Sequence, residues 1–205
     1  MNRPHTDERI VLASNNAGKV REFSQLLAQS HIQVIPQNQL GVPEVDETGL
    51  SFVENAILKA RNAAAHSGLA AIADDSGLEV DALGGAPGIY SARYAGSGAS
   101  DAANLTKLLA DLEGVEEARR SARFQCLMVY LRHAADPTPV VCQGTWEGSI
   151  LYGPQGENGF GYDPVFFVPT QHCSAAELDS EIKNALSHRG QALRKLVAYL
   201  QGQDQ

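Results

Sequence analysis

Several features that often define a protein are scarce in this chain of 205 residues. The three cysteines, Cys126, Cys142 and Cys173, are widely spaced and lack a CxxC or Cys/His pairing, which argues against a disulfide framework and a zinc site. We interpret Cys126 and Cys142 as small core residues. The absence of any run of about 18 apolar residues excludes a membrane-spanning helix. The polar start, MNRPHTDERI, lacks the apolar stretch of a secretory signal, so we expect a cytoplasmic protein.

The chain also contains fewer positively charged residues than negatively charged ones. Lys and Arg together number 16 against 24 for Asp and Glu, which gives a formal net charge of −8, and no Lys/Arg run occurs. Binding of a nucleic-acid polymer needs a concentrated basic surface. We therefore expect no RNA, DNA or membrane partner, whereas a small anion is compatible with the sequence where local cations or a metal hold it.

What the sequence does contain is typical of a globular α/β protein. Hydrophobic residues make up 43% and charged residues 20% of the chain, and its length fits one domain or two intimate lobes. We expect loose tails at residues 1–9 and 202–205. Hydrophobic patterning predicts strands at 10–13, 32–35, 70–73, 123–133 and 140–151, and helices after residue 19, over 51–68, over 99–112 and after residue 187.

The chain is organised around residues 71–96, whose centre is the sequence DDSG. The apolar run Ala70–Ala73 predicts a buried strand, and Asp74 and Asp75 follow it directly. Neighbouring residues on a strand point to opposite faces, so these two carboxylates can share one cleft only if the strand ends before them. A carboxylate beside apolar residues needs a cation, a donor or a proton, and such oxygen ligands suit Mg²⁺. An Asp/Gly turn without chemistry is the alternative.

A polar loop separates the first predicted strand from the helix that follows it. Such a loop directs free backbone N–H groups and the positive end of the helix dipole toward a ligand, which favours phosphate. The pattern differs from a Walker-type P-loop, because the earlier glycine is missing and Val20 stands where a hydroxyl is required. A helix cap with a solvated lysine is the alternative. The loop consists of Ser14, Asn15, Asn16, Ala17, Gly18 and Lys19.

An acidic linker precedes the second predicted helix. Ser51 and Glu54 form the pattern of a capping box at the start of this helix, and Gly68 is suited to end it. The linker is either a solvated loop or the source of a second carboxylate for a metal held by Asp75. Its acidic residues are Glu44, Asp46 and Glu47.

Two further motifs lie near the C-terminus. In the sequence GFGYDP, an aromatic ring beside flexible glycines can stack on a base, and Asp163 can accept hydrogen bonds from a base edge. A simple aromatic hairpin turn is the alternative. Farther on, Ser187 is suited to cap the last helix, which puts His188 and Arg189 in its first turn, where the dipole disfavours cations. An arginine placed against local preference indicates function.

Taken together in this order and spacing, the motifs SNNAGK, ADDSG, FGYD and SHR, with Lys183 upstream of the last, resemble the inosine triphosphate pyrophosphatase family. The resemblance runs from about residue 10 to about residue 200. It implies a long twisted mixed β-sheet flanked by helices, with two lobes and a central cleft in a single ITPase-like domain, residues 1–205. It also implies a homodimer and a Mg²⁺-dependent hydrolase that converts ITP, dITP and XTP to the nucleoside monophosphate and pyrophosphate.

The resemblance further assigns roles to individual residues. It makes Asp75 the catalytic and metal-binding aspartate. Asp46, Glu47 and Glu44 compete for the place of the second metal ligand, and we favour Asp46, with Glu47 next. It assigns the phosphate loop to Ser14, Asn15, Asn16, Ala17, Gly18 and Lys19. The remaining substrate contacts fall on Ser76, Phe160, Gly161, Tyr162, Asp163, Lys183, His188 and Arg189.

Two other functions are compatible with the same residues. A Mg²⁺-dependent phosphatase built around the two adjacent aspartates would release inorganic phosphate in place of pyrophosphate. A purine-nucleotide-binding module without catalysis would tolerate Asp75→Asn. An RNA-binding protein is the least favoured alternative because of the acidic balance.

Overall fold

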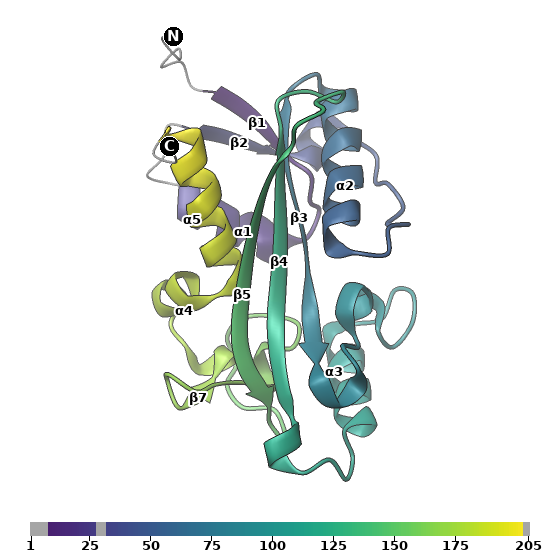
Figure 1. Cartoon of the computed structure of the whole chain (residues 1–205), viewed down its shortest axis with the longest axis vertical. Coiled ribbons are helices and arrows are strands. Elements are labelled where there is room, and N and C mark those ends of the chain that lie inside the picture. Colours follow the sequence, from purple (N-terminus) through teal and green to yellow (C-terminus); the bar gives the residue numbers. More distant parts are fainter. Residues whose placement is uncertain (1–7, 28–31, 203–205) are drawn as a thin grey trace. The chain divides into compact units, whose positions relative to one another are not determined.

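The structure of the protein, a computed structural model, describes residues 8–27 and 32–202. Within these ranges the strands are β1 Glu8–Leu12, β2 Ile32–Pro36, β3 Ala70–Val80, β4 Ser121–Leu131, β5 Val140–Ile150, β6 Phe166–Val168 and β7 Cys173–Ser174. The helices are α1 Ala17–Leu27, α2 Phe52–Ser67, α3 Asp101–Asp111, α4 Ser180–Leu186 and α5 His188–Leu200 (Figure 1). No helix in the described part of the chain is long and apolar enough to cross a bilayer.

The described strands form one seven-stranded sheet in the order β2-β1-β3-β4-β5-β6-β7. The sheet is mixed, because β1 is parallel to both β2 and β3 whereas β6 is antiparallel to β5 and β7. The predicted α/β fold with a mixed sheet flanked by helices is thereby confirmed. Because β1 and β3 are parallel, with Leu12 opposite Ile72, the segment that follows β1 begins beside the middle of β3, just before Asp74 and Asp75.

The chain divides into two compact units. The first comprises Met1–Asp75, Leu127–Cys142 and Ala192–Gln205, and the second comprises Ser76–Cys126 and Gln143–Gln191. The prediction of a single ITPase-like domain stays a prediction. Of the tails expected at 1–9 and 202–205, residues 1–7 and 203–205 lie outside the described residues. Glu8 and Arg9 belong to β1, and the Gly202 N–H donates to the Tyr199 carbonyl.

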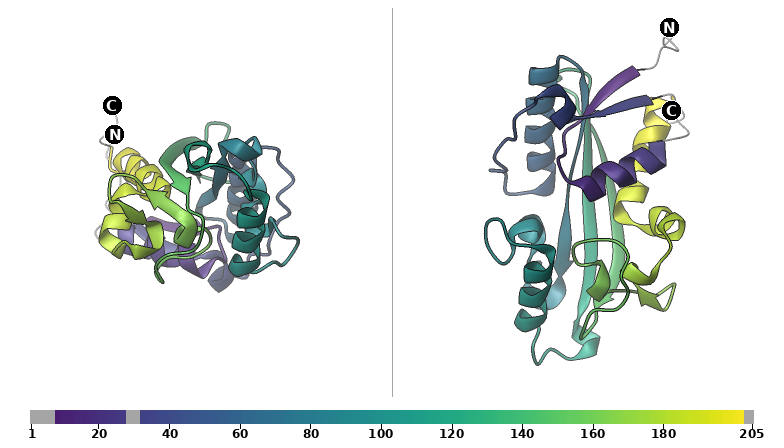
Figure 2. Two further views of the ribbon diagram at one scale, coloured as in Figure 1. Left: turned by 90° about the horizontal axis from the view of Figure 1, so that it is seen from below. Right: turned by 180° about the vertical axis from the view of Figure 1, so that it is seen from behind.

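In the first unit, α2 lies on one side of the strands and α1 and the end of α5 lie on the other (Figures 1 and 2). The inward side chains of α2 are small, so the helix packs closely against the sheet. This close packing buries both the helix residues and the strand residues that they contact. The predicted limits of α2 are confirmed, since the Ser51 hydroxyl accepts from the Glu54 N–H and Gly68 adopts the left-handed conformation. This packed layer consists of Ala56, Ala60, Ala63 and Ala64 with Val11, Ala13, Ala71, Ala73, Val129 and Leu131.

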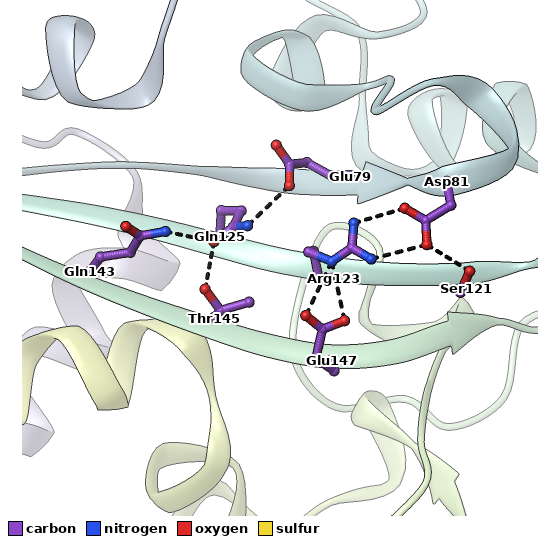
Figure 3. Close-up of polar contacts among 8 residues, drawn as sticks. All are labelled: Glu79, Asp81, Ser121, Arg123, Gln125, Gln143, Thr145 and Glu147. Atoms are coloured by element: carbon purple, nitrogen blue, oxygen red, sulfur yellow. Dashed lines mark hydrogen bonds and ion pairs between the residues drawn. The ribbon is translucent and has the colours of Figure 1, made fainter.

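In the second unit, one face of the strands is apolar and the other is polar. The apolar face contributes Leu78, Phe124 and Trp146 to the core of this unit, together with Leu108 of α3 and Leu112, the residue after that helix. On the polar face, side chains form cross-strand ion pairs and hydrogen bonds, a recognised source of sheet stability. Figure 3 shows this polar ladder, which comprises Glu79, Asp81, Ser121, Arg123, Gln125, Gln143, Thr145 and Glu147.

Two sequence expectations are wrong in detail. The strand expected over 70–73 continues to Val80, so the DDSG sequence lies inside β3 and not in a turn after it. The polar run before Ser187 forms a further helix, α4, with Lys183 buried in it. Both errors have the same cause. The charged side chains in these segments form ion pairs with residues that are distant in the sequence, so they can lie in a buried strand or helix.

Candidate active site

The polar loop after β1 forms the N-terminal cap of α1. The Asn16 side chain accepts from the Lys19 N–H at 3.0 Å, and the Ser14 hydroxyl accepts from the Asn16 N–H at 3.2 Å. Helix α1 begins at Ala17, so the first N–H groups of the helix follow the loop directly. An 11-residue helix with this start offers the dipole and the donors that favour an anion.

Two contacts join this loop to acidic residues of the same unit. The Asn15 side chain donates to a carboxylate oxygen of Glu44 in the acidic linker at 2.7 Å. The Lys19 ammonium lies 2.9 Å from Asp74 Oδ2, and the side chain of Asp74 is fully buried. Lys19 is therefore held in place by a buried carboxylate, which argues against the reading of a freely solvated lysine.

Asp75 takes a different partner because it points to the other face of β3. Its Oδ1 lies 2.8 Å from the ammonium of Lys59, a residue of α2. The same ammonium lies 2.8 Å from a carboxylate oxygen of Glu47 in the acidic linker. Lys59 thus bridges two carboxylates that are far apart in the sequence.

The sequence reasoning missed Lys59. It is the one lysine on a helix whose other inward residues are mostly alanine, and a charged side chain next to Ala56, Ala60 and Ala63 could have been the signal. A lysine on an apolar helix face needs a buried anion as a partner. The structure supplies Asp75 for this purpose.

Burial and charge shift the pKa values of this pair. Burial raises the pKa of Asp75 above its usual range, and the neighbouring ammonium groups of Lys59 and Lys19 offset this only in part. Burial by itself would lower the pKa of Lys59, but the carboxylates of Asp75, Asp74 and Glu47 outweigh it, so that pKa is raised. A carboxylate with a raised pKa at a cluster of charges is typical of functional sites.

The described residues contain no group of three or more His, Cys, Asp or Glu side chains arranged to hold a metal. Magnesium, however, is often bound by only one or two carboxylates together with water and substrate phosphates. Glu47 and Asp75 fit this requirement, since their oxygens already contact one shared cation, the Lys59 ammonium. Asp46, favoured from the sequence, is exposed. The geometry therefore favours Glu47 over Asp46.

A second group of predicted residues surrounds Asp163 in the second unit. Asp163 Oδ2 accepts from the Phe160 N–H at 2.8 Å and lies 2.7 Å from the buried ammonium of Lys183. A Cβ atom on Gly159 would lie 2.1 Å from the same oxygen, and Gly159 has a positive φ of 78°. Only glycine therefore fits beside the Asp163 carboxylate.

The ring of Phe160 is half-buried and flanked by cations. The Lys183 ammonium lies 5.0 Å from the ring centre and the Arg189 guanidinium 5.7 Å from it. Arg189 also donates to the Ser76 hydroxyl at 3.0 Å. The structure thus brings together Ser76, Phe160, Asp163, Lys183 and Arg189. The substrate contacts predicted for them stay predictions.

His188 and Tyr162 face the core of this unit. The His188 ring stacks on Phe124 with centres 4.8 Å apart, and it is buried. Tyr162 is also buried and donates its hydroxyl to the Ser91 carbonyl at 2.8 Å. Gly161 lies between the two aromatics, and its N–H donates to Asp101 at 2.8 Å. Of the two aromatic rings in this loop, Phe160 is the better placed to meet a ligand.

The chain is therefore an α/β protein with two clusters of charged side chains, each built around a buried aspartate. A sequence model of the Ham1 family matches residues 10–199, so the chain belongs to the Ham1 family. This result confirms the resemblance seen in the motifs.

Individual relatives are similar over nearly their whole length. A dITP/XTP pyrophosphatase of Thioalkalivibrio sulfidiphilus is 63% identical over 194 residues, which is 95% of this chain and 99% of that protein. A dITP/XTP pyrophosphatase of Vibrio parahaemolyticus is 61% identical over 196 residues, 96% of this chain and 98% of that protein. The solved structure of a HAM1 protein from Coxiella burnetii superposes with a TM-score of 0.89 at 51% identity, covering 95% of this chain and 99% of that one.

Proposed function

We propose that this protein hydrolyses the non-standard purine nucleotides ITP, dITP and XTP to the nucleoside monophosphate and pyrophosphate, which removes them from the nucleotide pool. The observation that carries this proposal is the Asp75 cluster, in which Lys59 joins that buried carboxylate to Glu47. This cluster lies in a chain that is 63% identical to a dITP/XTP pyrophosphatase.

The loop before α1 binds the triphosphate. The first N–H groups of α1 and the ammonium of Lys19 supply donors and positive charge for phosphate oxygens. The buried carboxylate of Asp74 keeps Lys19 in position. A preorganised cation costs little reorganisation when negative charge develops in the transition state.

Asp75 acts as the general base. A water oxygen forms a bond to the α-phosphorus while the bond from that phosphorus to the bridging oxygen breaks, and pyrophosphate departs with the bonding electron pair. The proton of the water passes to the Asp75 carboxylate. A raised pKa suits this role because a base works best when its pKa lies near the working pH. General base catalysis is typically worth about 10²–10⁴-fold in rate.

Glu47 and Asp75 would hold a Mg²⁺ ion. The donor set fits, because both are carboxylates, both contact the same cation, and Mg²⁺ prefers oxygen ligands. When bound, the ion would offset charge on the phosphate oxygens. Lys59 contacts the same two carboxylates and limits their mutual repulsion.

The group around Phe160 recognises the base. The Phe160 ring offers a face for stacking, and Arg189 and Lys183 offer donors to a keto oxygen at position 6 of the purine. An amino group at this position would leave those donors unpaired, at a cost of about 1–3 kcal/mol for each buried group. These donors therefore disfavour ATP and accept ITP, XTP and GTP, all of which carry a keto oxygen at position 6.

We further propose that the protein is a cytoplasmic homodimer. The three cysteines are free, which fits a reducing compartment. The dimer is proposed from the resemblance to the inosine triphosphate pyrophosphatase family.

One assay tests the proposed reaction. Purified protein with Mg²⁺ is given ITP, XTP, GTP and ATP side by side, and pyrophosphate and inorganic phosphate are measured separately. We expect pyrophosphate from ITP and XTP and almost none from ATP. Inorganic phosphate as the sole product would instead show a phosphatase, and tight binding of ITP without turnover would show a binding protein.

A further inference from the structure

We infer that Asn55 is a positioning residue that holds the Asp75 carboxylate in its working orientation and ties it to the end of the acidic linker. The Asn55 side chain is completely buried. Its Nδ2 donates to Asp75 Oδ2 at 3.4 Å, and its Oδ1 accepts from the Gly49 N–H at 2.8 Å. A single amide therefore contacts both the proposed base and the linker.

The helical spacing explains why Asn55 and Lys59 act on the same carboxylate. Residues four apart on a helix lie on the same face, one turn above the other. Asn55 contacts Asp75 Oδ2 and Lys59 contacts Oδ1 at 2.8 Å. With both oxygens held from one rigid helix, α2 determines the rotation of the Asp75 carboxylate.

The linker is packed against Asn55 so closely that Gly49 must be glycine. A Cβ atom on Gly49 would lie 2.8 Å from Asn55 Oδ1 and 2.6 Å from the Cβ of Glu54. Glu47, two residues earlier, contacts Lys59. The same helix face thus anchors the two carboxylates, Asp75 and Glu47, relative to each other.

An amide is the side chain that these two contacts require. Asn offers one acceptor and two donors on a short stem. Aspartate at this position would keep the acceptor for Gly49 but would face Asp75 with a second negative charge. Alanine would leave the Gly49 N–H without its buried acceptor, which carries a desolvation cost.

This inference rests on the proposed function, since it assigns Asn55 a role in the reaction of Asp75. Contacts of catalytic groups are often long before substrate binds and tighten afterwards, which fits the 3.4 Å distance. A small misplacement of a reacting group can cost about 10²-fold in rate. We therefore expect the loss of Asn55 to lower kcat far more than it changes KM.

The test compares Asn55→Asp with Asn55→Ala. Pyrophosphate release from ITP gives kcat and KM, and amide hydrogen exchange followed by NMR reports on Gly49. We expect both variants to lower kcat by about 10- to 100-fold, with KM nearly unchanged, as is typical for residues that orient a functional group. Exchange at Gly49 should accelerate in Asn55→Ala and stay slow in Asn55→Asp, which keeps the acceptor.

The matched control is Asn62→Ala. Asn62 lies on the same helix and donates to the Pro43 carbonyl at 2.7 Å, so it also joins α2 to the segment that leads into the linker. This variant should keep kcat within about twofold of the unmodified protein, as expected of a substitution away from special features. Comparable losses of kcat in Asn62→Ala and Asn55→Asp would show a general effect of the helix and overturn the inference.

Two results separate a failure of this inference from a failure of the proposed function. If the unmodified protein releases pyrophosphate but Asn55→Asp does so at a similar kcat, Asn55 does not position Asp75. If the unmodified protein releases none, the proposed function fails and the role assigned to Asn55 fails with it. Exchange at Gly49 then still decides whether Asn55 anchors the linker.

Discussion

Asp74 and Asp75 are neighbours in β3, yet each pairs with a different lysine. Asp74 Oδ2 lies 2.9 Å from Lys19 and Asp75 Oδ1 lies 2.8 Å from Lys59. Because successive side chains of a strand point to opposite faces, the two carboxylates serve two purposes. Asp74 orients Lys19 of the phosphate loop, and Asp75 is left to act as the proposed general base.

This division predicts different defects for the two aspartates. Asp75→Asn should abolish turnover in a folded protein, because an amide cannot accept the proton of the water. Asp74→Asn should weaken the hold on Lys19 and raise KM for ITP together with a loss of kcat. Steady-state kinetics on both variants, with circular dichroism to confirm folding, provides the measurement. A near-native rate in Asp75→Asn would remove Asp75 from the reaction.

Glu47 and Asp46, two of the three acidic residues of the linker, should differ in their effect on the metal. Glu47 shares the Lys59 ammonium with Asp75, whereas Asp46 is exposed. We expect Glu47→Gln to raise the Mg²⁺ concentration for half-maximal activity by at least about tenfold, in line with losses at metal sites. Asp46→Asn, the matched control, should have little effect. A larger shift in Asp46→Asn would restore the assignment made from the sequence.

Much of the site could be predicted from the sequence because its residues occur in short motifs. The loop of Ser14 to Lys19 follows a short apolar run and precedes an amphipathic helix, so its place at a helix start could be inferred. The limits of α2 were also readable, since Ser51 and Gly68 are strong cap residues. In these cases the signal and the structure lie within a few residues of each other.

The errors occurred where the decisive partner is distant in the sequence. Asp74, Asp75 and Gly77 are typical turn residues, but β3 continues through them because Lys19 and Lys59 neutralise the carboxylates. The sequence does not predict the helix α4, because its buried Lys183 is paired with Asp163, which lies in the segment before β6. Periodicity within a segment cannot reveal such pairs.

Arg189 should control the preference for a keto oxygen. Its guanidinium is buried beside Phe160 and donates to Ser76. Arg189→Ala removes a donor that only a 6-keto purine satisfies, so the ratio of kcat/KM for ITP to that for ATP should fall by about tenfold or more.

The selectivity of Arg194→Ala serves as the control for this prediction. Arg194 is an exposed residue of the same helix, and its removal should leave the ratio of ITP to ATP unchanged. If the ratio of kcat/KM for ITP to that for ATP is unchanged in Arg189→Ala, Arg189 does not contribute to base recognition.

The loop between β4 and β5 contains an ion pair that should contribute to stability. The side chain of Asp136 is almost completely buried and accepts from the Arg132 guanidinium at 2.7 and 2.5 Å and from the Thr138 N–H at 3.0 Å. The guanidinium holds the pKa of Asp136 well below its usual range. Arg61 of α2 also donates to the Asp136 carbonyl at 3.2 Å, which attaches the loop to α2 within the first unit.

Replacement of this carboxylate should therefore destabilise the protein in a manner that depends on pH. A carboxyl group with a lowered pKa in the folded state stabilises that state above its unfolded pKa of about 3.9, and this contribution is lost as the pH falls further. Asp136→Asn should lower the urea midpoint at pH 7, and its difference from the unmodified protein should narrow below about pH 4. Glu113→Gln, an exposed substitution, should change the midpoint at neither pH. A constant difference between Asp136→Asn and the unmodified protein at all pH values would show that packing, and not the charge of Asp136, stabilises this loop.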